Sequence, residues 1–194
     1  MLNRENAIQT LNNNQFKELG DKVFFIKIKE IPFLKKINLR LDPNDKNCVS
    51  SCSKILGTML PTKANTYSTN TINEKIMWLG PNEWLIVSDD DAFLKLQNKI
   101  EDIEASLTDV SENRTIIRIL GSKVFVLLSK FLVLDLEKNL PTQSSCAQTL
   151  FVKVPVLLVR NHHEGTPEID IFTNRSHANY IYNLLVDGTK NLDF

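Results

Sequence analysis

The sequence contains little glycine and little cysteine. Its six glycines are dispersed over 194 residues, and none belongs to the G-x-G-x-x-G or G-x-x-x-x-G-K-[ST] patterns that cradle phosphates. The usual signatures of dinucleotide and nucleoside-triphosphate binding are therefore missing. Three cysteines, an odd number, do not suggest a disulfide framework. A chain of this length does not need one, because folding buries roughly 70% of its extended surface.

The sequence also lacks an excess of either charge and any long apolar run. Lys and Arg total 23, as do Asp and Glu, so the formal net charge is zero. Binding to nucleic acid usually requires a basic excess. The longest apolar stretches, such as 124–128 and 154–159, are far shorter than a membrane span, and the N-terminus has no secretory pattern. We therefore expect a cytoplasmic protein with neither a nucleic-acid nor a membrane partner.

Apolar periodicity predicts strands mixed with helices. Period-two alternation favours strands, and apolar residues three or four apart favour helices. Together these patterns predict an α+β fold with mainly antiparallel sheets and about four helices. The predicted strands are 23–29, 34–41, 65–71 (an edge strand), 75–79, 84–88, 114–120, 150–159 (one strand, or two with a bulge) and 168–172. The predicted helices are 45–59, a helix that begins at 89–91 and continues past Ile103, 121–131 and 176–185.

The predicted organisation is one domain with two polar ends. Residues 1–21 form a polar, loosely attached N-terminal arm, residues 22–186 form the domain, and residues 187–194 form a C-terminal tail. A weak strand–helix similarity between the halves allows two subdomains, 22–110 and 111–186. In the helix over 45–59, Asn44 or Asp45 is the expected N-cap and Pro61 the expected stop.

The two tryptophans flank one turn, in the stretch WLGPNEWLI (78–86). A two-residue loop at Pro81 and Asn82 would place Trp78 and Trp84 on opposite faces of the hairpin. A longer loop that includes Gly80 would make them cross-strand partners on one face. Because Pro-Asn suits the favoured two-residue turns poorly, we expect the longer loop and a shared face packed in a core.

Several polar residues have both a structural and a chemical interpretation. Asp109 and Ser111, in the cluster DVSENR, suit turns in which side chains bind nearby backbone N–H groups. Cys48 and Cys52 have helical spacing and lack a second pair of metal ligands. The pair His162-His163 suits a solvated hairpin loop. Cys146 precedes an apolar strand and suits packing better than nucleophilic chemistry.

Six motifs follow one another along the chain: FLKKINLR (33–40), LPT (60–62), WLGPNEWLI (78–86), DVSENRT (109–115), CAQT (146–149) and NRSHANY (174–180). In this order they resemble one known family, the gamma subunit of heterotetrameric sarcosine oxidase. The resemblance covers roughly residues 22–186, and its specificity comes from motif order and spacing. The sequence departs from the family at Leu41, where glycine is usual, at Glu137-Lys138, where His-Pro is usual, and at Ser145, where a basic residue is usual.

The resemblance implies a non-catalytic subunit with an assembly role and a fold like that of the folate-binding aminomethyltransferases. The complex would be an oxidoreductase that converts sarcosine to glycine, hydrogen peroxide, and formaldehyde or methylenetetrahydrofolate. The implied partners are the alpha, beta and delta subunits, which would hold FAD, FMN, NAD, zinc and tetrahydrofolate, with no cofactor in this chain. The candidate structural or interface residues are Trp78, Pro81, Trp84, Asp109, Ser111, Arg114, Cys146 and Gln148.

Two rival functions stay open. A stand-alone folate-dependent aminomethyltransferase-like protein would need an acidic residue at a folate cleft, and Asp109 is the candidate for it. An iron–sulfur maturation factor of the same fold would need a Lys-Gly-Cys-Tyr-x-Gly-Gln run, which the SSCAQ sequence at 144–148 does not match.

Overall fold

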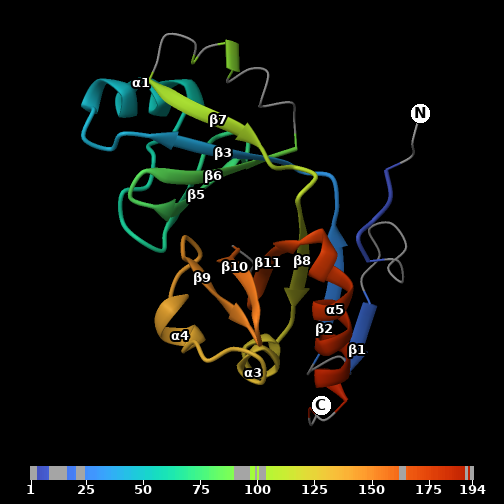
Figure 1. Cartoon of the computed structure of the whole chain (residues 1–194). Coiled ribbons are helices and arrows are strands. Elements are labelled where there is room, and N and C mark those ends of the chain that lie inside the picture. The colour runs from blue at the N-terminus through green and yellow to red at the C-terminus, as the bar shows by residue number, and fades with distance from the viewer. Residues whose placement is uncertain are drawn as a thin grey trace. The chain divides into compact units, whose positions relative to one another are not determined.

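The computed structural model describes residues 4–8, 17–20, 25–89, 97–98, 100, 104–161, 165–190 and 192. Two compact units form the chain (Figure 1). The six-stranded unit combines the described parts of residues 1–32 and 112–194, and the five-stranded unit comprises those of residues 33–111. The six-stranded unit is thus assembled from both ends of the chain, with the other unit inserted between its second and third strands.

All strand pairs of the six-stranded unit are antiparallel, and helices cover one face of its sheet. In β2 the side chains alternate, so that Ile26 and Ile28 enter the core while Phe25 lies on the other face, half-buried. The sheet order is β1 (Lys17–Gly20), β2 (Phe25–Ile31), β8 (Arg114–Leu120), β11 (Glu168–Asn174), β10 (Val154–Arg160) and β9 (Cys146–Phe151), and the helices are α3 (Val124–Ser129), α4 (Leu136–Asn139) and α5 (Arg175–Thr189).

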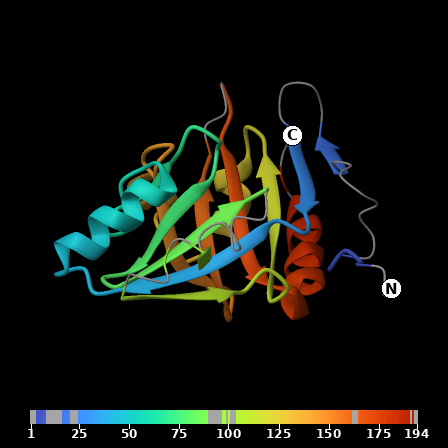
Figure 2. The same ribbon diagram turned by 90° about the horizontal axis from the view of Figure 1, so that it is seen from above.

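The five-stranded unit is also antiparallel, and its helix α1 (Lys46–Leu56) packs on one sheet face (Figure 2). Cys48, Cys52 and Leu56 point into that core at helical spacing. Its sheet order is β4 (Tyr67–Thr69), β5 (Lys75–Gly80), β6 (Glu83–Ser88), β3 (Lys35–Leu41) and β7 (Ala105–Asp109).

Local signals set both ends of α1. The Asp45 side chain accepts hydrogen bonds from the backbone N–H groups of Asn47 (2.9 Å) and Cys48 (3.0 Å), as an N-cap does. The helix ends before Pro61, because Gly57 adopts a left-handed conformation with φ of 67° and its N–H bonds back into the last turn. The predicted cap is confirmed, and the predicted stop at Pro61 is wrong.

The α+β fold with antiparallel sheets is confirmed, and most predicted strands are present. The stretch 150–159 forms two strands, β9 and β10, joined by a turn at Val152 and Lys153. Strands β1 and β7 were not predicted. The helix predicted to begin at 89–91 and to continue past Ile103 lies mostly outside the described residues. Positions 97, 98 and 100 are described and helical, whereas Asp89 and Glu104 are described and not helical. The pair His162-His163 lies outside the described residues.

The described parts of the N-terminal arm are attached firmly, which differs from the loose arm expected from the polar sequence. Strand β1 pairs with β2, and Ile8 is fully buried in the core of the six-stranded unit. The buried Glu30 carboxylate accepts hydrogen bonds from the N–H groups of Ala7 and Ile8, both at 3.0 Å, and from the Thr115 hydroxyl at 2.5 Å. Burying a carboxylate without hydrogen-bond partners costs free energy. Two of the partners of Glu30 belong to the arm, so the carboxylate holds the arm against the unit.

Candidate subunit interface

The tryptophan hairpin places the two tryptophans at paired positions on neighbouring strands. Trp78 on β5 lies directly opposite Trp84 on β6, so the shared face is confirmed. The loop is nevertheless the short one, because Pro81 and Asn82 form the turn and Gly80 pairs with Glu83. A β-bulge between Trp78 and Gly80 shifts the register by one residue, so that Trp78 pairs with Trp84 despite the short loop.

The two rings differ in burial. Trp84 is 2% exposed, belongs to the core of the five-stranded unit, and donates its indole N–H to the Pro61 carbonyl at 2.8 Å. Trp78 is half-buried and Pro81 is exposed. Trp84 therefore has a structural role, and the outer part of the hairpin is the portion that another protein can reach.

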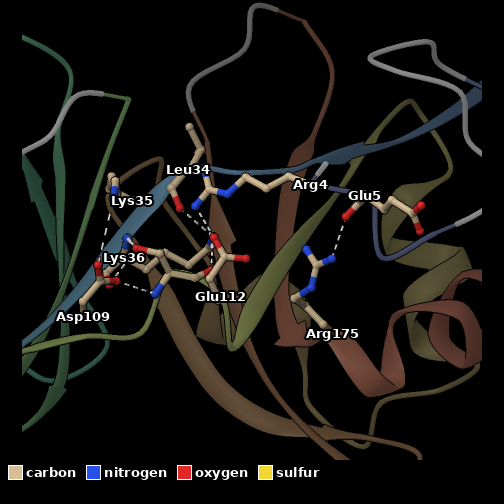
Figure 3. A network of polar contacts seen from close by, with 9 residues as sticks. Arg4, Glu5, Leu34, Lys35, Lys36, Asp109, Glu112 and Arg175 are labelled. Carbon is tan, nitrogen blue, oxygen red and sulfur yellow. Dashed lines mark hydrogen bonds and ion pairs between the residues drawn. The ribbon is translucent and has the colours of Figure 1, made fainter. Parts of the chain in front are cut away.

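A polar network connects the end of β7 with β3 (Figure 3). The Asp109 carboxylate accepts the Ser111 N–H at 2.8 Å, the predicted side-chain-to-backbone turn, and lies 4.0 Å from the Lys35 ammonium. The Ser111 hydroxyl accepts the Lys36 N–H at 2.9 Å, and the fully buried Lys36 ammonium donates to the Leu34 carbonyl, also at 2.9 Å. The carboxylate that a folate-dependent reaction would use is thus engaged in joining two strands.

A second network in Figure 3 anchors the N-terminal arm. Arg4 forms an ion pair with Glu112, and Arg175 at the start of α5 donates to the Glu5 carbonyl at 2.6 Å. Both contacts lie within the six-stranded unit. They fix the described part of the arm beside the first turn of α5.

The structure brings Arg114 and Gln148 together, although 34 positions separate them in the sequence. Both line a cavity of about 160 Å³ in the six-stranded unit, with Thr149 and Asn174 among its other polar residues. Pockets for drug-sized ligands are typically ~300–1,000 Å³, so this cavity is smaller than a usual pocket for a ligand of that size. Cys146, for which the sequence favours packing, is buried on β9 opposite Val159.

A charged cluster that no sequence motif indicated lies on the sheet face opposite the helices. Arg118 binds Asp170 through two hydrogen bonds, of 2.7 and 2.8 Å, and lies 3.3 Å from Glu168. Glu168 also accepts the side-chain amide of Asn161 at 2.9 Å. In a strand with alternating residues, a charged side chain usually faces solvent, so the sequence shows no sign that these charges are buried. Their burial is evident only from the structure, in which Asp170 is 2% exposed.

The cysteines of α1 are protonated core residues. Burial is the main factor that raises the pKa of the Cys52 thiol to about 12, and the neighbouring Cys48 adds to the effect. Burial followed by the charge of Asp45 raises the pKa of Cys48. Over the part of the chain that the structure describes, no three His, Cys, Asp or Glu side chains gather as metal ligands. None of the described helices has the length and apolar character to span a membrane.

Two antiparallel sheets with helices packed on them give the chain the fold class of an aminomethyltransferase. The glycine cleavage system aminomethyltransferase T from Bartonella henselae superposes with a TM-score of 0.63 at 14% identity, over 82% of this chain and 45% of that one. A chain of the heterotetrameric sarcosine oxidase from Corynebacterium sp. U-96 superposes with a TM-score of 0.79 at 22% identity, over 89% of this chain and 87% of that one. Both likenesses concern the fold.

Sequence comparison identifies the family. The sarcosine oxidase subunit gamma of Corynebacterium sp. (strain P-1) is 24% identical over 148 residues, which cover 75% of this chain and 72% of that protein. Residues 40–191 match the sarcosine oxidase, gamma subunit family. The chain belongs to this family, and the resemblance inferred from its six motifs is confirmed.

Proposed function

We propose that this chain is a non-catalytic gamma subunit that stabilises a heterotetrameric sarcosine oxidase. Membership of the gamma subunit family, matched over residues 40–191, is the observation that carries the proposal. The partners would be the alpha, beta and delta subunits. FAD, FMN, NAD, zinc and tetrahydrofolate would be held by those partners, and the complex would work in the cytoplasm.

The state of Asp109 supports an assembly role over a stand-alone folate-dependent enzyme. Its carboxylate accepts the Ser111 N–H and faces the Lys35 ammonium, so it already has partners within the chain. A carboxylate poised for proton transfer should instead reach the substrate within hydrogen-bond distance. Asp109, Ser111 and Trp84 therefore serve the structure in this proposal, whereas Trp78, Pro81, Arg114 and Gln148 remain candidate interface positions.

Co-expression with alpha, beta and delta subunits tests the proposal. The chain should co-purify with them, and omission of its gene should lower the yield of the complex while the flavin content of each remaining beta subunit stays the same. A chain that purifies alone from cells expressing all four subunits contradicts the proposal.

Titration with tetrahydrofolate distinguishes the proposed assembly role from the aminomethyltransferase-like alternative. Calorimetry on the purified chain should show no binding at micromolar concentrations if folate belongs to a partner. Clear micromolar binding that is lost in Asp109→Asn would favour the aminomethyltransferase-like alternative.

A further inference from the structure

A groove of about 530 Å³ follows the outer side of α1 in the five-stranded unit. The inner side of the helix supplies Cys48, Cys52 and Leu56 to the core, so the groove lies on the side of α1 away from its own sheet. Pockets that bind small molecules enclose most of the ligand. This groove is bounded by one helix and a turn, which suits a segment of protein better. The residues that line it include Pro43, Lys46, Val49, Ser50, Lys54 and Met59.

Two apolar side chains at or near one end of the groove are exposed among the described residues. Met59 is 80% exposed, and Ile72 is 66% exposed. Hydrogen bonds from Ser68 to the Met59 carbonyl (2.8 Å) and from Asn70 to the Leu56 carbonyl (2.9 Å) place the turn that carries Ile72 beside the C-terminal end of α1. Methionine adapts to varied partners and is common at binding surfaces. Met59 therefore gives the groove an exposed apolar end, and the turn that carries Ile72 lies beside the same end of α1.

The charged residues that line the groove have one sign. Lys46 and Lys54 line it, none of its lining residues is acidic, and neither lysine side chain has an ion pair or hydrogen bond to any described residue. The nearby Asp45 is occupied as the N-cap, and Asp42 accepts hydrogen bonds from Asn44.

The position of Lys46 adds to this evidence. It lies in the first turn of α1, which contains no acidic residue, and the helix dipole disfavours a cation at this end. Helix stability alone therefore does not account for a lysine here. An external carboxylate beside the groove would offset the unfavourable interaction with the dipole.

We propose that this groove, the α1 groove, docks a segment of another subunit that inserts an apolar side chain and presents a carboxylate to each of the two lysines. The inference rests on the proposed function and adds the contact surface and the chemistry of the partner. Lys46 and Lys54 are about 12 Å apart along the helix, from a rise of 1.5 Å per residue. Two carboxylates about eight residues apart on a helix, or four apart on a strand of ~3.3 Å per residue, match this spacing.

Affinity measurements on the assembled complex test the α1 groove. The alpha, beta and delta subunits are immobilised together, and the equilibrium constant for binding the complete gamma chain is measured at several salt concentrations. Lys46→Glu with Lys54→Glu should weaken binding at least tenfold and remove most of its salt dependence, because exposed charge pairs are screened by salt. The matched control, Lys138→Glu with Lys153→Glu, makes the same change of charge in the six-stranded unit and should shift affinity less than threefold.

Two uncharged or apolar positions provide an independent test. Ser50→Trp places a large ring at the groove without changing the charge and should weaken binding at least tenfold. Met59→Asp should do the same, whereas Val133→Asp, at an exposed valine of the six-stranded unit, should not. Thermal melts of each purified variant establish that it is folded before its affinity is compared.

The outcomes separate the two proposals. If the unmodified chain does not bind the other three subunits, both the proposed function and the groove are overturned. If it binds, and the charge-reversed and Ser50→Trp variants bind as tightly as the controls, the docking site is overturned while the proposed function stands.

Discussion

Gly121 lies against the backbone of Phe25, so closely that a Cβ atom at position 121 would be 2.0 Å from the Phe25 carbonyl oxygen. Gly121 follows β8 and Phe25 begins β2, so the contact closes the end of this strand pair in the six-stranded unit. The φ angle of Gly121, 147°, is also one that residues with a side chain rarely adopt.

Gly121→Ala should be among the most destabilising single changes in the chain. Backbone strain of ~1–3 kcal/mol adds to displacement of the Phe25 backbone, so we expect a loss of more than about 4 kcal/mol. Denaturant unfolding measures it, with Gly165→Ala as the control. Gly165 has a φ of 77°, but a Cβ atom added there would lie within 4 Å of no described atom, so only the strain of about 1–2 kcal/mol applies. Equal losses in the two variants would contradict the steric explanation.

The two tryptophans should differ in stability and in fluorescence. Trp84→Ala should cost on the order of 3–5 kcal/mol, because it removes a buried ring, and Trp78→Ala should cost less because this ring is half-buried. Trp78→Phe leaves the buried Trp84 as the sole tryptophan, and its emission should lie at shorter wavelength than that of Trp84→Phe. The reverse order of emission maxima would show that the burial of the rings is assigned wrongly.

Glu30→Gln should loosen the N-terminal arm. The substituted amide replaces one acceptor oxygen by an NH₂ group, so either the Ile8 N–H loses its acceptor, or the Ala7 N–H and the Thr115 hydroxyl, which share the other oxygen, lose theirs. Hydrogen bonds to charged groups contribute about 1.5–3 kcal/mol each. Hydrogen exchange at the amides of Ala7 and Ile8 should therefore accelerate. Glu137→Gln, at an exposed position of α4, is the control, and unchanged exchange in Glu30→Gln would refute the anchoring role of this carboxylate.

The thiols of α1 should resist modification in the folded chain. With the pKa of Cys52 at about 12, the nucleophilic thiolate is scarce at pH 8, and a thiol reagent should react with Cys48 and Cys52 only after denaturation. Rapid labelling of either residue in the native chain at that pH would contradict this expectation.

The same raised pKa predicts a pH dependence of stability. The folded chain holds the Cys52 proton more tightly than the unfolded chain, whose thiol has the ordinary pKa of 9.0. The stabilising contribution is therefore complete below pH 9 and is lost as the pH rises from about 9 toward 12. Urea midpoints should fall more steeply over this window in the original chain than in Cys52→Ala.

Local patterns predicted the parts of the fold that depend on neighbours in sequence. Strand β8 was predicted with its observed bounds because its alternation is strong, and α1 was located by its Asp45 cap and its apolar spacing. Strand β7 was not predicted because none of its five residues is buried, so its sequence lacks a clear apolar alternation. The Trp78–Trp84 pairing was predicted correctly although the bulge that produces it was not.

The candidate interface was less accessible to sequence reasoning. Arg114 and Gln148 could each be selected from motifs, but only the order β8-β11-β10-β9 places them at one cavity. The α1 groove carried no motif at all, because it is defined by exposure of Met59 and by the charges of Lys46 and Lys54, which have no partner among the described residues. The exposure of a side chain and its ion pairs depend on the folded surface, so a sequence motif does not report them.

By itself, the sequence determined the family, the α+β class, and most strands and helices, since period-two and helical spacing act over a few residues. The tertiary structure alone decided that β2 pairs with the distant β8 as well as with its sequence neighbour β1, and that Glu30 secures the N-terminal arm. Those choices depend on which apolar faces can be buried together across more than 80 residues of chain, and no local pattern encodes the partner of a strand.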